Sequence, residues 1–326
     1  METKVLGRTG LQVSIVGLGG ANIGLKEPND PYRQHILEPS ASIANPELGI
    51  ATVRAALESG ATLIDTAPRY QAGASELTIG VALYTSPELA QNAIVTTKLG
   101  CTYPGDGFDH SYEKAREIFR QSMRLLGKSS LEIAYLHDPM GFDMNLVMGP
   151  NGTMQALRDL RNNGKIKWIG IAANDPDTAA DYIETGQFDV ATVSGAWSLI
   201  NQRAAERIFP AAARHNVGIV VTTAIERGLL ATGGPENKHY LERNFSPACI
   251  ARVSQIKALC ESFSIPLVAA ALQWCTRHPQ VACTIPGARI PEEARQNTLA
   301  GLIEIPEDFW GALDPLVEHF ESYQEV

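Results

Sequence analysis

Four side chains of the types that move protons lie at or just after the ends of buried, strand-like segments. One apolar segment ends at Asp65 with Tyr70 in the polar turn that follows, a second ends at Lys98, and a third ends at His137. The carboxyl ends of parallel strands meet on one side of an α/β enzyme, where its chemistry takes place. We therefore expect this carboxylate, phenol, ammonium and imidazole to lie together. The alternative for Asp65 and Tyr70 is a purely structural role, in which Asp65 caps the turn and Tyr70 packs against other side chains.

Such a group suits proton transfer at a carbonyl or alcohol oxygen. A Tyr phenol has a reference pKa of about 10, so near neutral pH it needs a neighbouring cation to favour the phenolate. Lys98 can supply that charge, Asp65 can hold and balance the ammonium, and His137 can orient a substrate oxygen or share its proton. The sequence contains no nucleophile elbow, no H-E-x-x-H and no metal-ligand cluster. Hydride transfer with a bound cofactor is the chemistry that this pattern predicts.

The elements that position these residues alternate between strand and helix patterns. Strands are predicted at residues 13–18, 61–65, 93–98, 133–137, 167–172, 190–194, 218–223 and 281–285. Helices are predicted at residues 49–60, 75–84, 111–126, 153–163, 176–185, 202–215, 247–263 and 267–277. Near-continuous apolar strands that alternate with helices indicate a closed (β/α)₈ TIM barrel, with long loops at its C-terminal face. A doubly wound sheet is the alternative, although no G-x-G-x-x-G opens the first helix.

The chain shows no domain boundary or low-complexity tract, so we expect a single domain over residues 1–326. Two long connections, 21–48 and 226–245, interrupt the alternation, and loops of this length are usually functional lids or disordered. Ser75 and Glu76 resemble a helix cap with an acid in the first turn.

Composition limits the class of protein. A net charge of −9 without a basic run argues against a nucleic-acid surface. The absence of a signal-like start and of a long apolar run predicts a cytoplasmic protein that does not engage a membrane. Five cysteines without a C-x-x-C pair indicate reduced, packed thiols and no metal site. The sequence is compatible with an oligomer as well as with a monomer. The other histidines have no metal-like spacing and are expected at the surface or in loops, at His35, His110, His215, His239, His278 and His319.

The chain resembles an aldo-keto reductase over essentially its whole length. The motifs that carry the resemblance are GRTGLQVSIVGLGG, LIDTAPRY, VTTKLG, YLHDP, GKIKWIGIAAN and IPGARIPEEARQN. The resemblance implies that Asp65, Tyr70, Lys98 and His137 form the family's catalytic tetrad, because each stands in its expected motif. Within the family, DTAPRYQAGASE, LHDP and VSGAWSLINQ are similar to the D-threo-aldose 1-dehydrogenase and L-galactose dehydrogenase branch.

The resemblance also implies NAD or NADP, bound extended across the barrel mouth without a Rossmann fold. Asn174 matches the family's carboxamide-holding Asn, but Ala173 replaces the usual Ser before it, and Thr222 replaces an aromatic often found under the nicotinamide. The adenosine segment has Arg289, whereas Ile290 and Glu293 fall where further cations often stand in NADP-preferring relatives, which favours NAD over NADP. The implied cofactor contacts are Gly20, Ala21, Asp65, Asn174, Ser194, Thr223, Ile225, Gly228, Leu230, Pro286, Gly287, Ala288, Arg289, Glu293 and Asn297.

A polar, sugar-like substrate needs hydrogen-bonding groups around the tetrad. The candidates are Asn22, Arg69, Gln71, Asp138 and Trp197. Asp138 is equally well explained as a turn cap before Pro139, and Trp197 as a packed core aromatic. The predicted function is hydride transfer between NAD(P) and a sugar-like alcohol, hemiacetal or carbonyl, as in an aldose 1-dehydrogenase, with Tyr70 as the general acid or base. The alternatives are an NADPH-dependent aldehyde or ketone reductase and a non-catalytic, nucleotide-binding regulatory barrel.

Overall fold

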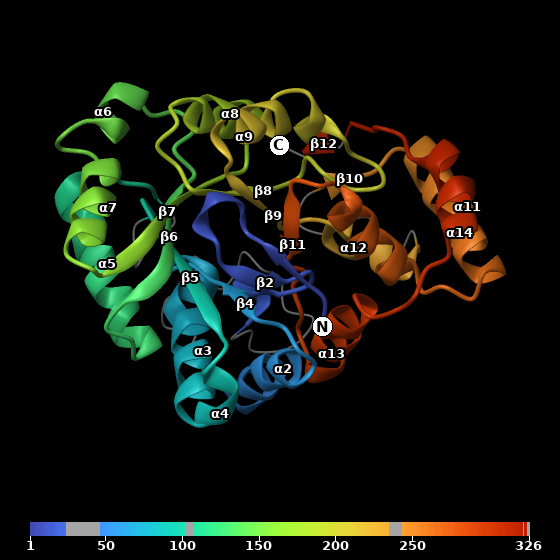
Figure 1. Cartoon of the computed structure of the whole chain (residues 1–326), viewed down its shortest axis with the longest axis horizontal. Helices are drawn as coiled ribbons and strands as arrows, with labels where there is room; N and C mark the ends of the chain where they lie inside the picture. The colour runs from blue at the N-terminus through green and yellow to red at the C-terminus, as the bar shows by residue number, and fades with distance from the viewer. Residues whose placement is uncertain (24–45, 102–106, 235–242, 322, 325–326) are drawn as a thin grey trace.

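An eight-stranded parallel sheet lies at the centre of the protein (Figure 1). The structure, a computed structural model, describes residues 1–23, 46–101, 107–234, 243–321 and 323–324. The strands follow one another around the sheet in the order β11-β9-β8-β7-β6-β5-β4-β3. Their bounds are β3 (Leu18–Gly19), β4 (Leu63–Asp65), β5 (Ile94–Leu99), β6 (Leu131–His137), β7 (Ile166–Ala173), β8 (Val190–Val193), β9 (Gly218–Val221) and β11 (Val281–Thr284).

The sheet curls so that segments beside its first and last strands meet. Isolated parallel bridges join Val16 to Thr284 and Gly19 to Gly287, and the Gly17 N–H donates to the Thr284 carbonyl at 2.8 Å. This curled sheet of eight parallel strands is consistent with the (β/α)₈ barrel that the sequence predicts.

Helices surround the strands, with α3, α5, α8 and α12 on different sides of the sheet in Figure 1. The longer helices are α2 (Pro46–Glu58), α3 (Ala74–Tyr84), α5 (Tyr112–Leu126), α7 (Thr153–Asn162), α8 (Pro176–Glu184), α9 (Ile208–His215), α11 (Pro247–Ser262), α12 (Leu267–Arg277) and α13 (Pro291–Ala300). Shorter helical segments are η1 (Gly7–Thr9), η2 (Gly20–Asn22), η3 (Tyr70–Gly73), α4 (Pro87–Ala90), α6 (Met144–Met148), η4 (Arg203–Ala205), η5 (Glu226–Gly228), α10 (Leu229–Thr232), α14 (Glu307–Leu313) and η8 (Asp314–Leu316).

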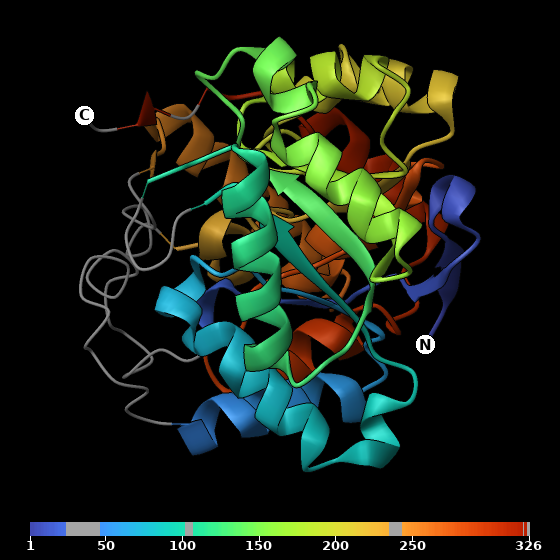
Figure 2. The same ribbon diagram turned by 90° about the vertical axis from the view of Figure 1, so that its left-hand side faces the viewer.

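An antiparallel hairpin of β1 (Thr3–Val5) and β2 (Gln12–Ser14) precedes the sheet. Leu6 from this hairpin is fully buried and packs so close to the backbone of Gly218, at the start of β9, that a Cβ there would lie 2.7 Å from Leu6. The hairpin therefore covers the amino ends of the strands. Figure 2 shows it on the opposite side of the molecule from β12 (Tyr323–Gln324), which pairs with β10 (Arg243–Asn244).

Two buried layers hold the sheet in place. Inward-facing side chains, among them Leu63, Ile133 and Tyr135, form one cluster inside the curl, and a larger cluster fills the space between strands and helices. Tyr135 fits only because Gly170 lies beside it, where a Cβ would stand 2.2 Å from the ring. All five cysteines are buried and free, which confirms that they are packed thiols.

Within the described part of the chain, no single helix is long and apolar enough to cross a membrane. Helices α11 and α12 reach that length and apolar composition only when taken together, and the two helices meet at a bend of 101°.

Several predicted elements are wrong in extent. The strand predicted at 13–18 is divided between β2 and β3, because the Ser14 hydroxyl donates to the Val16 carbonyl at 2.7 Å and turns the chain. The helix predicted at 202–215 is interrupted after η4 and restarts as α9, since Pro210 lacks an N–H and is tolerated only in a first turn.

The two predicted loops and the predicted cap also differ from the structure. Helix α2 begins within the connection 21–48, and η5, α10 and β10 lie within 226–245; residues 24–45 and 235–242 of these connections lie outside the described residues. Ser75 does not cap α3, whose N-cap is Gly73. Its hydroxyl is buried and donates instead to the Gly20 carbonyl at 2.8 Å.

Candidate active site

The four proton-transfer side chains meet at the carboxyl ends of β4, β5 and β6. Lys98 Nζ lies 2.5 Å from Asp65 Oδ2 and 3.0 Å from the Tyr70 hydroxyl. The rings of Tyr70 and His137 stand edge to face with centroids 6.4 Å apart. Asp65, Lys98 and His137 are buried, whereas Tyr70 is half-buried. The structure thus brings together the residues that the sequence singled out; we refer to them as the tetrad.

Strand geometry explains the alignment of Lys98 with Asp65. Thr96 and Lys98 are two residues apart in β5, so both point to the same face of the sheet. The Thr96 hydroxyl donates to Asp65 Oδ1 at 2.8 Å while Lys98 takes Oδ2, and Lys98 Nζ also donates to the Thr66 carbonyl at 2.9 Å. Both carboxylate oxygens are therefore held by β5.

Tyr70 reaches this pair from the tight turn η3. Gln71 and Ala72, the residues after it, have left-handed φ angles of 50° and 49°. Such angles are uncommon for residues other than glycine and persist where the surroundings hold them. Here the Gln71 side chain is buried, and its amide nitrogen donates to the Ala21 carbonyl at 2.8 Å.

The pKa of Tyr70 is raised well above its ordinary value, by burial first and then by the negative charges of Asp65 and Asp138. Lys98 therefore does not bring the pKa of Tyr70 below its ordinary value. The physical reason is that burial dominates and that the Lys98 charge is balanced by Asp65 at 2.5 Å. Tyr70 is a neutral phenol at neutral pH, which is a proton donor.

His137 is a neutral imidazole. Burial lowers its pKa well below the ordinary value, and the nearby charges of Lys98, Arg69 and His110 lower it further. Its Nδ1 atom is buried and finds no hydrogen-bond partner among the described residues. Its Nε2 atom lies 3.6 Å from Asp138 Oδ2, which is beyond a hydrogen bond. Neither ring nitrogen is therefore hydrogen-bonded to a described residue.

The predicted carboxamide-holding residue, Asn174, follows β7 beside Asp138. Its Nδ2 donates to Asp138 Oδ2 at 2.9 Å, and its Oδ1 accepts from the Ser194 hydroxyl at 2.8 Å. The exposed Asn174 side chain keeps one amide hydrogen and one oxygen lone pair beyond these bonds. A donor and an acceptor on adjacent atoms fit a primary carboxamide, the group that a nicotinamide carries.

The other predicted cofactor contacts lie in segments that follow strand ends. Gly20 and Ala21 form η2 after β3, and Thr223 accepts from the Gly195 N–H at 2.5 Å. Ile225, Gly228 and Leu230 follow β9, and Pro286, Gly287 and Ala288 follow β11. The side chains of Leu230 and Ala288 are fully buried, which leaves only their backbones for contacts with a ligand.

An ion pair dominates the predicted adenosine segment. Glu293, in the first turn of α13, accepts from the Arg289 backbone N–H at 2.8 Å and lies 2.5 Å from the Arg289 guanidinium. Asn297, one turn further along α13, donates to the Gly287 carbonyl at 3.2 Å. The Glu293 carboxylate thus offsets the charge of Arg289.

Two of the predicted substrate residues have structural partners. Gln71 is tied to Ala21, and the Asn22 side chain lies beside Gly287, where an added Cβ would stand 3.0 Å from Asn22 Nδ2. These contacts connect the segments after β3, β4 and β11.

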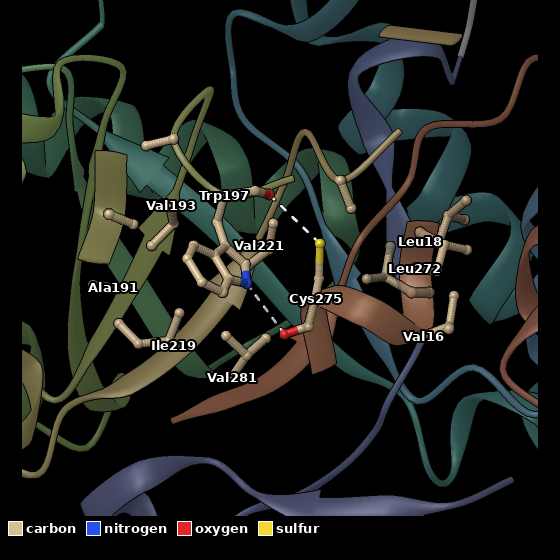
Figure 3. Packing of buried hydrophobic residues seen from close by; sticks show 14 of the residues in the cluster. Val16, Leu18, Ala191, Val193, Trp197, Ile219, Val221, Leu272, Cys275 and Val281 are labelled. Atoms are coloured by element: carbon tan, nitrogen blue, oxygen red, sulfur yellow. Dashed lines mark hydrogen bonds between the residues drawn. The ribbon is translucent and has the colours of Figure 1, made fainter. Parts of the chain in front are cut away.

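The structure favours the packing alternative for Trp197. Its ring stacks on Trp274 with centroids 4.7 Å apart and meets Phe209 and His278 edge to face. Its Nε1 donates to the Cys275 carbonyl at 3.3 Å, and the Cys275 thiol lies 3.5 Å from the Trp197 carbonyl (Figure 3). The side chain is 8% exposed and joins β8 to α12.

Sequence reasoning missed an aromatic wall beside His137. The Phe108 ring lies 5.9 Å from that of His137, with the Arg69 guanidinium 5.1 Å above its face, and His110 packs edge to face on Phe142 at 4.7 Å. His110 lies in a loop, as predicted, but it is buried there rather than exposed; His35 and His239 lie outside the described residues. These side chains lie in irregular segments, where no periodicity in the sequence indicates burial.

The parallel α/β fold thus brings a Tyr, a Lys and an Asp together beside a neutral His at the carboxyl ends of its strands. Residues 17–318 match the Aldo/keto reductase family, and the chain belongs to it. Enzymes of this family use nicotinamide cofactors.

Curated relatives match almost the whole chain. It is 29% identical to pyridoxal 4-dehydrogenase of Microbacterium luteolum, covering 96% of each chain. It is 28% identical to D-threo-aldose 1-dehydrogenase of a Pseudomonas species, covering 93% of this chain and 94% of the relative. It is 26% identical to L-galactose dehydrogenase of Arabidopsis thaliana, covering 92% and 88%. The resemblance to these two sugar dehydrogenases that the sequence predicts is confirmed.

A solved structure supports the fold. The holo form of an aldo-keto reductase from Bacillus halodurans superposes with a TM-score of 0.77 at 23% identity, covering 97% of this chain and 96% of the other.

Proposed function

We propose that the protein is an NAD(P)-dependent dehydrogenase that moves a hydride between the nicotinamide and a sugar-like alcohol, hemiacetal or carbonyl. The observation that carries the proposal is the position of Lys98 Nζ, 2.5 Å from Asp65 and 3.0 Å from the Tyr70 hydroxyl, beside His137. The names of the sugar dehydrogenases among its relatives support the substrate class. In this proposal the chain forms one domain and its sheet is a closed barrel.

The chain's own residues supply the proton chemistry. His137 holds the substrate oxygen, and Tyr70 exchanges a proton with that oxygen while Lys98, held by Asp65, lies against the phenol. Asn174, held by Ser194, would bind the carboxamide of a nicotinamide, which when bound would supply or take up the hydride. In the oxidative direction Tyr70 must first lose its own proton, which its raised pKa opposes. We therefore expect the oxidative rate to rise with pH above neutrality.

The main experiment tests Tyr70 directly. Tyr70→Phe removes only the hydroxyl, so we expect turnover of an aldose panel to fall by about 10²–10⁴, with dinucleotide affinity unchanged. Tyr84→Phe is the matched control, because Tyr84 is 87% exposed at the end of α3. A Tyr70→Phe enzyme with near-normal kcat would refute the assignment.

Cofactor preference is proposed to favour NAD. The Glu293 carboxylate suits a ribose diol and offsets Arg289, whereas a 2′-phosphate needs uncompensated cations. Titration with NAD⁺, NADH, NADP⁺ and NADPH, followed by the fluorescence of the four tryptophans, measures this preference. Glu293→Gln removes the negative charge beside Arg289, and we expect it to raise NADP⁺ affinity relative to NAD⁺. An unchanged ratio would show that Glu293 does not set the preference.

A second candidate is reduction of aldehydes or ketones with NADPH. It is favoured by the raised pKa of Tyr70, since a neutral phenol is the form that protonates a carbonyl oxygen. This second candidate would be favoured if, at neutral pH, the enzyme turns over aldehydes with NADPH faster than aldoses with NAD⁺. A non-catalytic regulatory barrel is disfavoured by the complete tetrad, and it would require dinucleotide binding without turnover of any carbonyl or sugar.

A further inference from the structure

Asp138 occupies an unusual position between the tetrad and Asn174. Its φ angle is 46°, in the left-handed region that Asp and Asn tolerate better than most residues. Its backbone N–H donates to the Ala172 carbonyl at 2.7 Å, and the side chain is buried to 8% exposure. The chain therefore turns sharply after His137 and places a carboxylate inside the site.

Both oxygens of that carboxylate bind Asn174. Oδ1 accepts from the Asn174 backbone N–H at 2.9 Å, and Oδ2 accepts from the Asn174 side-chain Nδ2 at 2.9 Å. An ionised carboxylate only accepts hydrogen bonds, so it determines which end of the Asn174 amide faces it. Oδ1 of Asn174 is left to Ser194 at 2.8 Å. The orientation of the amide thus follows from the charge state of Asp138.

Several charged or titratable groups surround Asp138. His137 Nε2 lies 3.6 Å from Oδ2, and His110 Nε2 is 3.4 Å from the Asp138 carbonyl. Lys98 and Arg69 are the cations that act on its carboxyl, and its negative charge contributes to the raised pKa of Tyr70. Burial is the largest effect and raises the pKa of Asp138 to about 6, against the hydrogen bonds from Asn174.

We propose that Asp138 is a positioning residue that orients Asn174 for the nicotinamide and makes dinucleotide binding depend on the protonation of its own carboxyl group. This inference rests on the proposed function. Protonation puts a hydrogen on Oδ1 or Oδ2, and each of these oxygens accepts from an Asn174 donor. A protonated oxygen is the poorer acceptor, so one of the two hydrogen bonds that hold Asn174 is weakened or lost. The Asn174 amide, with its matched donor and acceptor, is then held less firmly for a carboxamide.

The test uses Asp138→Asn, because Asn tolerates the left-handed backbone and keeps the shape of the side chain. The single side-chain oxygen of the introduced Asn can accept a hydrogen bond from only one of the two Asn174 donors, the backbone N–H or Nδ2. Asp189→Asn is the matched control: Asp189 is also buried, accepts the Ile169 backbone N–H at 3.0 Å, and pairs with Arg8 of the amino-terminal hairpin, away from the tetrad. Affinities for NAD⁺ and NADP⁺ are measured by tryptophan fluorescence from pH 5 to pH 8.

For the wild type we expect affinity to be constant above pH 7 and to fall below pH 6, as Asp138 takes up its proton. At pH 8 Asp138→Asn is expected to bind on the order of tenfold more weakly, because one charge-assisted hydrogen bond is lost. Its affinity does not fall further on acidification. Asp189→Asn is expected to be less stable than the wild type and to keep the wild-type affinity and pH profile.

A spectroscopic measurement on the free protein separates positioning from a general structural effect. The His137 ring stays neutral over this range because its pKa is lowered, so its NMR shifts should show a step near pH 6 that reports Asp138. That step should vanish in Asp138→Asn. The double variant Asp138→Asn with Asn174→Asp restores a donor facing an acceptor, and should recover the melting temperature lost in Asp138→Asn.

The outcomes are distinguishable. If the wild type binds a dinucleotide and Asp138→Asn matches it in affinity and pH profile, the inference is overturned while the proposed function stands. The same holds if the swapped variant does not regain stability, or if the His137 step persists in Asp138→Asn. If the wild type binds none of the dinucleotides, the proposed function fails and the inference fails with it.

Discussion

Strand β5 presents a threonine to a buried carboxylate on each of its two faces. On the inner face the Thr96 hydroxyl donates to Asp65 at 2.8 Å, and on the outer face the Thr97 hydroxyl donates to Glu76 of α3 at 2.6 Å. Asp65 is 3% exposed and Glu76 is 0% exposed. The two carboxylates therefore share burial and a threonine donor, and they differ in their second oxygen.

That second oxygen meets a cation on one face only. Lys98 Nζ lies 2.5 Å from Asp65, whereas Glu76 Oε2 has no hydrogen-bond partner in the described part of the chain. Ser122 lies near Glu76 and lowers its pKa, but its hydroxyl does not complete a hydrogen bond. Burial raises the pKa of Glu76 to about 7. The two carboxylates thus differ in their cation: Lys98 pairs directly with Asp65, whereas Glu76 has no such partner among the described residues and its pKa is raised by burial.

Removing the cation should have the largest effect, because it makes the inner face resemble the outer one. We expect Lys98→Met to lower turnover by about 10²–10⁴. The free energy of unfolding should fall by about 3–5 kcal/mol, since Asp65 loses its partner while buried. Lys167→Met, at a lysine whose side chain is 67% exposed, is the control and should change neither quantity appreciably. Normal turnover in Lys98→Met would show that the cation beside Asp65 is not what distinguishes it functionally from Glu76.

Glu76→Gln should change the pH dependence of stability. The pKa of Glu76 is raised to about 7 in the folded protein from a reference of 4.5, so between these values the folded state binds the extra proton. Wild-type stability therefore contains a penalty that grows as the pH rises from 4.5 and is complete above 7. Without the carboxyl, Glu76→Gln should gain about 3 kcal/mol relative to the wild type between pH 4.5 and pH 8. Urea unfolding at both pH values measures the gain, and parallel pH curves would contradict it.

Substitution of the two threonines should have the smallest effects on stability, but it should separate the inner face from the outer face most clearly. Thr96→Val and Thr97→Val each remove one buried donor at nearly constant volume, and each should cost about 1–2 kcal/mol of unfolding free energy. Only Thr96→Val should also lower kcat, because it loosens the carboxylate that holds Lys98. An equal loss of kcat in both variants would mean that the outer face also takes part in the chemistry.

Much of the site could be predicted because it depends on local patterns. Apolar runs that end in Asp65, Lys98 and His137 show which strand ends carry ionisable side chains, and parallel strands bring their carboxyl ends together. The bond from Asp138 to Asn174 could not be predicted, because it depends on a left-handed angle and on the spacing of two loops. Ser75 was misassigned since its hydroxyl is used by Gly20, which lies 55 residues away in sequence.

The amino-acid sequence by itself determined the alternation of strands and helices, the family, and the identity of the tetrad. These follow from side-chain periodicity and from residue types at strand ends, which neighbouring residues encode. Only the tertiary structure decided the protonation of Tyr70 and His137, the contrast between Asp65 and Glu76, and the packing of Trp197. The reason is physical: burial and the distance to the nearest charge set a pKa, and both are properties of the folded arrangement.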